Sequence, residues 1–277
     1  MSTMTTTTGI RTQERRVINA RQMPLALQVT TLAWRSLKNN LRTPAVLLPS
    51  LIISVFFLLV YEATLGDAAN FFLSGQSYLG FILPLSIVSA ALSGASTAGQ
   101  DIVRDIENGY FDKLMLTPVS RGALLLGPML AGAAMLVIQT GVVTLVGLLM
   151  GLQPATGALG ISAMLGMALL LGVAFSGFTV GVALRSGSAA ATGAAGFLFF
   201  PLSFLTATFV PVDLLSGWIQ TAATYNPITY VLEAMRALLN TGWDVEIMLR
   251  GISASLVLGV LMYTFALFSL RSRVRRK

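Results

Sequence analysis

Cysteine and histidine, which carry much of protein chemistry, are both missing from this chain of 277 residues. Their absence excludes a disulfide framework, thiolate or imidazole metal sites, and catalysis by either residue. We therefore predict no metal site. Charge is also scarce, because only 10% of the residues are charged, whereas 55% are hydrophobic and the mean hydropathy is +0.79. This balance excludes an ordinary soluble domain and predicts an integral membrane protein.

The sequence also lacks the motif with which ATPases of the P-loop class hold phosphates. That motif ends in Gly-Lys followed by Ser or Thr, and no Gly-Lys dipeptide occurs in the chain. We therefore predict that the chain is not an enzyme and binds no cofactor itself. The net charge is +7, but the positive residues lie at the ends of apolar segments and do not form a continuous face. This distribution argues against nucleic-acid binding.

Six apolar stretches each approach the roughly 20 residues that a helix needs to cross a bilayer. They lie at about 44–62, 78–99, 123–150, 158–184, 189–210 and 247–270. We expect an all-α membrane domain of six transmembrane helices over residues 44–270. No cluster of Asp, Glu or Lys lies at mid-depth in these stretches. This argues against a secondary carrier and favours an apolar or amphipathic substrate.

The distribution of Lys and Arg predicts the orientation. With a cytoplasmic amino terminus, the inner side holds all but two of the 18 Lys and Arg residues, the exceptions being Arg236 and Arg250. Positive residues gather on the cytoplasmic side of membrane proteins, and an even number of spans puts both termini there. We expect a disordered cytoplasmic tail at residues 1–21 and a basic cytoplasmic tail at 271–277.

Residues 22–43 predict an amphipathic helix at the cytoplasmic membrane surface. Apolar side chains recur near helical spacing, and basic side chains with one tryptophan lie on or beside the polar side. The apolar residues are Leu25, Val29, Leu32 and Leu37, and the others are Trp34, Arg35, Lys38 and Arg42. Tryptophan is common at membrane interfaces.

Charge is concentrated in residues 100–122, which we call the coupling segment. Six charges at about 3 kcal/mol each would cost on the order of 18 kcal/mol at a bilayer centre, so this segment does not span the membrane. As one interfacial helix it aligns Ile102, Ile106, Tyr110 and Leu114 in an apolar stripe. Gly109 weakens this helix by about 1 kcal/mol, which favours a bend or a close contact there, and Pro118 ends it. A solvated loop without a partner is the alternative.

Residues 211–246 are too polar to span the membrane but carry several aromatic side chains. Asn226 and Pro227 predict an N-cap and a first helical position, and Glu233 lies three residues before Arg236, where the two can pair. The aromatic residues are Trp218, Tyr225, Tyr230 and Trp243. We expect a re-entrant hairpin of short helices at the extracellular interface.

Glycine pairs at the spacing that allows close helix approach occur in two spans. They are Gly147 with Gly151 and Gly177 with Gly181. Packing within one chain is the favoured interpretation. A dimer interface or a translocation route is the alternative.

Two strings resemble a known family. ENGYFDKLMLTPVSR, from Glu107 to Arg121, resembles the cytoplasmic segment after the second span of ABC-2 type permeases, most closely the daunorubicin-resistance type. FVPVDLLSGWIQTAATYNPITYVLEAMRALL, from Phe209 to Leu239, resembles the carboxyl-terminal pattern of the same family. The matching residues in the second string are Pro211, Trp218, Asn226, Pro227, Tyr230, Glu233 and Arg236.

The resemblance implies a mechanism and partners. The coupling segment would dock on a separate ATP-binding subunit, which would hold ATP and Mg. The residues implied in this contact are Ile106, Glu107, Gly109, Tyr110, Phe111, Asp112, Lys113, Leu114, Thr117 and Pro118. Two copies of this chain, as a homodimer surrounded by membrane lipid, would work with two ATP-binding subunits in a bacterial or archaeal cell membrane.

The implied function is export of a hydrophobic or amphipathic drug, lipid or peptide, with the extracellular hairpin gating its exit. A polysaccharide or glycolipid exporter is the nearest alternative. A secondary carrier and a non-transporting membrane scaffold are the alternatives from other classes.

Overall fold

The computed structural model describes residues 23–69, 77–206 and 212–275, and within these ranges every regular element is helical. The all-α prediction is therefore confirmed for the part of the chain that the structure describes. The longer helices are α1 (Leu25–Leu41), α2 (Pro44–Ala69), α3 (Tyr78–Glu107), α5 (Arg121–Leu149), α6 (Gly157–Ser186) and α11 (Val245–Arg275). The shorter elements are α4 (Tyr110–Met115), α7 (Ala189–Phe197), α8 (Phe199–Phe204), η1 (Val212–Leu214), α9 (Trp218–Tyr225), α10 (Pro227–Arg236) and η2 (Ala237–Thr241).

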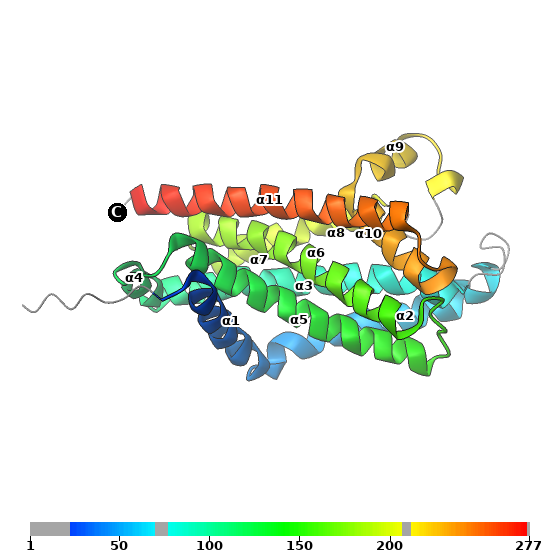
Figure 1. Cartoon of the computed structure of the whole chain (residues 1–277), viewed down its shortest axis with the longest axis horizontal. Helices are drawn as coiled ribbons and strands as arrows, with labels where there is room; N and C mark the ends of the chain where they lie inside the picture. The colour runs from blue at the N-terminus through cyan, green and yellow to red at the C-terminus, as the bar shows by residue number, and fades with distance from the viewer. Residues whose placement is uncertain (1–22, 70–76, 207–211, 276–277) are drawn as a thin grey trace, which may run out of the picture.

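The long helices form an elongated bundle with α6 at its centre. Helix α6 packs against α3, α5 and α11, and all four run along the long axis of the molecule (Figure 1). The short α4 lies at one end of this axis, together with the carboxyl end of α11, whereas α9 and α10 lie toward the other end (Figure 1). The coupling segment and the predicted hairpin are therefore at opposite ends of the bundle.

Two glycines of α6 allow α11 to approach closely. A Cβ on Gly177 would lie 3.2 Å from a backbone carbon of Met262, and a Cβ on Gly181 would lie 2.4 Å from the Phe265 ring. Side chains at these two positions would push the helices apart. Packing within the chain, the favoured interpretation of this glycine pair, is what the structure shows.

Four helices are long and apolar enough to cross a membrane, in a search limited to the described residues. They comprise part of α2, together with α5, α6 and α11. The remaining two predicted spans correspond to shorter apolar segments, Tyr78–Val88 at the start of α3 and Ala189–Phe204 across α7 and α8. The second half of α3 is rich in Ser, Ala and Gly and ends in charged residues, which lowers its hydropathy. The structure supports a multi-pass membrane protein, while six spans remain a prediction.

Helix α1 lies obliquely across the bundle, near the end that carries α4 (Figure 1). Its exposed side includes Leu27, Trp34 and Leu41, seven residues apart, which are 50%, 63% and 45% exposed. Its buried side includes the polar residues Gln28 and Asn40. The structure thus shows a helix within the predicted range 22–43, with polar side chains turned inward and large apolar ones outward. Its place at the membrane surface stays a prediction.

Candidate functional site

The coupling segment does not form the single helix that its periodicity predicted. Helix α3 continues to Glu107, Asn108 caps it, and Gly109 takes a left-handed conformation with φ of 66° before α4 begins. The Gly109 N–H donates to the Ile106 carbonyl at 3.0 Å. Glycine commonly ends helices in this way because it has no Cβ to oppose the left-handed conformation. The bend expected at Gly109 is in fact a helix end, so the predicted continuous apolar stripe is wrong.

The turn, α4 and the residues that follow it expose five of the ten residues implied in docking. Glu107, Asp112, Lys113, Thr117 and Pro118 are exposed, whereas Ile106, Tyr110 and Leu114 are half-buried. The resulting surface carries charges of both signs on a short helix at one end of the bundle. Such a surface is available to a partner subunit.

Phe111 differs from the other residues of α4. Its side chain is only 2% exposed and belongs to the hydrophobic cluster that contains Ile102 and Leu125. Burial of a phenylalanine contributes about 2 kcal/mol or more. Phe111 therefore anchors α4 to the bundle and is not part of the exposed surface of α4.

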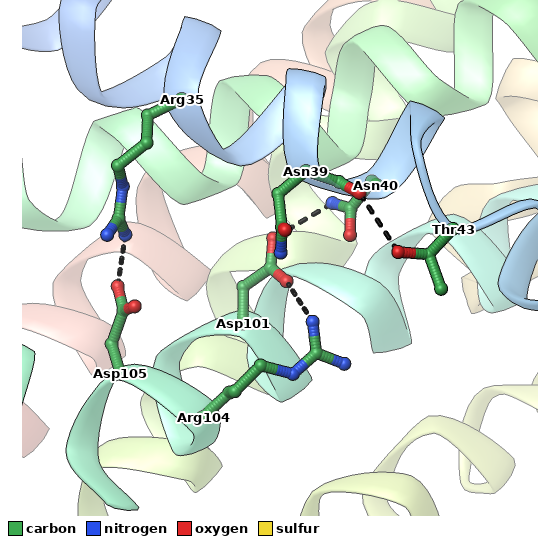
Figure 2. A network of polar contacts seen from close by, with 7 residues as sticks. All are labelled: Arg35, Asn39, Asn40, Thr43, Asp101, Arg104 and Asp105. Carbon is green, nitrogen blue, oxygen red and sulfur yellow. Dashed lines mark hydrogen bonds and ion pairs between the residues drawn. The ribbon is translucent and has the colours of Figure 1, made fainter. Parts of the chain in front are cut away.

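Helix α1 holds the junction of α3 and α4 through Arg35. The Arg35 guanidinium forms an ion pair with Asp105 of α3, as Figure 2 shows. The same guanidinium lies over the Tyr110 ring at the start of α4, with its central carbon 4.2 Å from the ring centroid. Arg35 thus contacts both sides of the turn at Gly109, which limits how far α4 moves relative to α1.

A second contact between α1 and α3 involves a buried carboxylate. Asn40 Nδ2 donates to Asp101 Oδ2 at 2.8 Å, and Arg104 Nη1 lies 3.6 Å from Asp101 Oδ1 (Figure 2). Asp101 lies two residues beyond the predicted span 78–99. Burial raises the pKa of its carboxyl group to about 6, although the Asn40 hydrogen bond and the Arg104 charge act in the opposite direction. The carboxyl group therefore keeps its proton to a higher pH than an exposed aspartate does.

Gln28 connects α1 to the far end of the coupling segment. Its Oε1 accepts a hydrogen bond from the Ser120 N–H at 2.8 Å, and its Nε2 donates to the Met23 carbonyl at 2.7 Å. Ser120 in turn caps α5, because its hydroxyl accepts from the Ala123 N–H at 3.1 Å. Helix α1 therefore holds the coupling segment at both ends.

Sequence reasoning missed two features of this site. Leu116 directly follows α4 and is 89% exposed. It lies within the string from Glu107 to Arg121 that resembles the family, and this position could have marked it as a candidate contact residue. The contacts of Gln28, Arg35 and Asn40 with the coupling segment were also missed, since they connect residues 61 to 92 positions apart. For these contacts the sequence carries no local signal.

At the opposite end, the predicted N-cap of the hairpin is confirmed. Asn226 Oδ1 accepts from the Ile228 N–H at 3.0 Å, and Pro227 is the first residue of α10. Asn226 Nδ2 also donates to the carbonyls of Leu202 and Leu205, at 2.7 and 2.9 Å. One side chain thus starts α10 and attaches it to the end of α8.

Helix α10 lies mostly inside the bundle, with Arg236 as its main polar contact. Arg236 Nε donates to the Phe81 carbonyl at 2.9 Å, and its guanidinium carbon lies 3.6 Å from the centroid of the Phe81 ring. The residue is 7% exposed. The sequence predicted Glu233 as the partner of Arg236, on the same helix. The contact of Arg236 with Phe81 of α3 was not predicted, because the spacing of Glu233 and Arg236 gives no information about α3.

The other hairpin residues separate into exposed and attached side chains. Trp218, Tyr225 and Trp243 are 73%, 84% and 57% exposed, consistent with a position at a membrane interface. The Tyr230 hydroxyl donates to the Thr224 carbonyl at 2.7 Å, which links α10 to α9. Pro211 lies outside the described residues.

The apolar helices and their packing define a multi-pass membrane protein built only from helices, as far as the structure describes the chain. The sequence pattern of the ABC-2 type transporter family matches residues 27–240. The chain therefore belongs to the ABC-2 type transporter family. It is a membrane permease subunit of an ABC transporter, and subunits of this kind lack an ATPase site and work with separate ATP-binding subunits.

Several relatives carry names that refer to drug resistance. The chain is 28% identical over 263 residues to the daunorubicin resistance ABC transporter permease protein DrrB1 of Streptomyces coeruleorubidus, covering 92% of each chain. It is 25% identical over 187 residues to the probable doxorubicin resistance ABC transporter permease protein DrrC of Mycobacterium tuberculosis, covering 68% of this chain and 67% of that one. A putative transport permease of Cyanophora paradoxa is 27% identical over 202 residues, covering 71% and 69%.

Proposed function

We propose that this chain is the permease of an exporter that moves an amphipathic, drug-like molecule out of the cell. The observation that carries the proposal is α4, a short helix with exposed charges that Phe111 and Arg35 fix to one end of the bundle. A rigid exposed helix transmits movement of a docked partner to the helices behind it. An ATP-binding subunit is the partner that this family uses.

In this proposal the exposed residues of the coupling segment, with Leu116, contact the ATP-binding subunit. ATP and Mg bind that subunit, and closure of two such subunits tilts two copies of α4. Because α4 is attached to α3 and α1, the tilt reaches the membrane helices directly. Six spans in each of two identical chains, with both termini in the cytoplasm, complete this arrangement.

The hairpin at the other end serves as the exit gate. Asn226 attaches α10 to α8, and Arg236 attaches it to α3. Both contacts change when α3 or α8 moves. The hairpin is therefore placed to respond to the tilt of the membrane helices.

The substrate class follows from two considerations. The predicted spans carry no charged cluster at mid-depth that would neutralise a strongly charged cargo. Two of the relatives are named for resistance to daunorubicin or doxorubicin. A planar amphipathic drug fits both considerations better than a polysaccharide.

The test begins with co-purification of the chain from native membrane after mild detergent extraction. We expect an ATP-binding subunit to accompany it, and Asp112→Lys to abolish that association together with the coupled ATPase activity. Asp67→Lys provides the matched control. Asp67 is also an exposed acidic residue, but it lies near the carboxyl end of α2 and not on α4. This variant should retain the partner.

Other outcomes would contradict the proposal. A wild-type preparation without ATPase activity would favour a carrier or a scaffold. Equal loss of the partner in both variants would show that the charge change disturbs assembly in general. Drug accumulation in inverted vesicles then tests the substrate class, and uptake should require ATP and the intact α4 surface.

A further inference from the structure

A basic pocket of about 420 Å³ lies between α1 and the end of α3. Four cations line it, opposed by two carboxylates. The cations are Arg35, Lys38, Arg42 and Arg104, and the carboxylates are Asp101 and Asp105. The lining therefore has an excess of positive charge.

The excess charge is concentrated on α1. Arg35 pairs with Asp105, and Arg104 lies 3.6 Å from Asp101, so each carboxylate already has a cation (Figure 2). Lys38 and Arg42 are exposed, and neither side chain has a hydrogen-bond or ion-pair partner among the described residues. These two cations are available to an anion that enters the pocket.

A second cavity of about 430 Å³ adjoins the first and shares Asp101 and Arg104 with it. It is lined by residues of α2, α3 and α7, including Ile53 and Phe197, which are 52% and 77% exposed. A charged chamber thus continues into a cleft in which the apolar side chains of Ile53 and Phe197 lie among polar ones. This combination suits a ligand with an anionic head and a hydrocarbon tail.

The pocket lies at the depth where lipid headgroups are expected. Arg42 directly precedes the predicted span 44–62, and Asp101 directly follows the predicted span 78–99. The outward apolar face of α1, with Trp34 at its middle, belongs to the same region. Free phosphate would use the charged chamber but would make no use of the apolar side chains that line the second cavity.

We propose that this pocket binds an anionic phospholipid from the leaflet in which α1 lies. Lys38 and Arg42 hold the headgroup phosphate, and an acyl chain lies along Ile53 and Phe197. The bound lipid braces α1 against the carboxyl end of α3, where the coupling segment begins. The proposal does not depend on the proposed function.

The test uses the purified full-length chain in detergent, with bound lipid counted by native mass spectrometry. Phosphatidylglycerol should bind, and phosphatidylcholine should not compete with it. Each cation removed should weaken binding about fivefold, so Lys38→Gln with Arg42→Gln should weaken it roughly 30-fold. The double variant Arg271→Gln with Arg275→Gln removes the same charge from the carboxyl end of α11, outside the pocket, and should bind like the wild type. Equal weakening in both double variants would overturn the proposal.

The cleft is tested separately with Gly193→Leu. A Cβ at Gly193 meets only the Gln100 side chain, at 3.8 Å, so a leucine there narrows the cleft without a clash at Cβ. Phosphatidylglycerol should bind several-fold more weakly to this variant, whereas glycerol 3-phosphate, which has no tail, should bind both proteins equally. Wild-type protein that binds glycerol 3-phosphate as tightly as the lipid would show that the ligand is a free phosphate.

A second copy of the chain could occupy the cleft in place of a lipid, and a further experiment distinguishes the two. Because the chain has no cysteine, Ile53→Cys introduces one defined thiol. Disulfide-linked dimers of this variant in membranes would show that a second copy covers the cleft, and would overturn the lipid proposal. Thiol labelling at this position that phosphatidylglycerol slows would support it.

Discussion

The turn at Gly109 decides whether the coupling segment is one helix or two, and substitutions there have calculable costs. Gly109 has φ of 66°, and a Cβ at this position would meet no atom within 4 Å. Alanine therefore adds no clash, and its only local cost is the left-handed conformation, about 1 kcal/mol. Alanine also favours a continuous helix by about 1 kcal/mol over glycine. The sum of about 2 kcal/mol shifts the balance toward one continuous helix roughly 30-fold.

Docking affinity measures this shift. The ATP-binding subunit should bind Gly109→Ala permease in nanodiscs up to roughly 30-fold more weakly than wild type, because only the two-helix form presents α4 correctly. Gly109→Asn should lie between the two, since asparagine tolerates the left-handed conformation better and favours helix less. Gly141→Ala is the matched control, because a Cβ there also meets nothing within 4 Å, but Gly141 lies within α5 at an ordinary helical φ.

Two outcomes would refute this reasoning. Gly109→Ala permease that docks as tightly as Gly141→Ala permease would show that the turn does not matter for docking. Tighter docking of the alanine variant than of the asparagine variant would show that the continuous helix is the active form.

Three further predictions concern stability, each measured as thermal unfolding in detergent. Arg236→Lys should cost about 2 kcal/mol, because lysine cannot both donate to the Phe81 carbonyl in the same geometry and stack on its ring; an unchanged midpoint would contradict this. Burial raises the pKa of the Asp101 carboxyl group from 3.8 to about 6. The protonated carboxyl group therefore stabilises the fold at pH values below 3.8, and this stabilisation is lost as the pH rises through about 6. Asp101→Asn should remove that part of the pH dependence, and an unaltered pH profile would argue against the assignment. Gly177→Leu should cost about 1 to 3 kcal/mol, because its Cβ would lie 3.2 Å from an α11 backbone carbon, whereas Gly166→Leu, where a Cβ meets nothing within 4 Å, should be tolerated.

Local sequence signals predicted much of the candidate site. The charge of residues 100–122 excluded a membrane span, and the two strings led to the correct family. Asn226 and Pro227 predicted a helix start that the structure shows. Each signal depends on residues close together in the chain, where spacing alone fixes which groups meet.

The prediction of one helix over residues 100–122 failed for a tertiary reason. Periodicity and helix propensity predicted a helix that is destabilised at Gly109. Local destabilisation alone does not determine whether the helix bends or ends at that residue. Burial of Phe111 in the core and the contact of Arg35 with Tyr110 favour the turned form. Neither contact is visible from the spacing of residues within the segment.

The sequence by itself determined the class of protein, its helical content and the chemistry exposed on the coupling segment, because hydropathy and charge act residue by residue. Only the tertiary structure decided which face of α1 turns inward, where α4 begins and what Arg236 contacts. These features depend on side chains far apart in the chain that meet only when the helices pack. Arg236 and Phe81, 155 residues apart, are held together by the whole bundle, and no local pattern specifies such a pair.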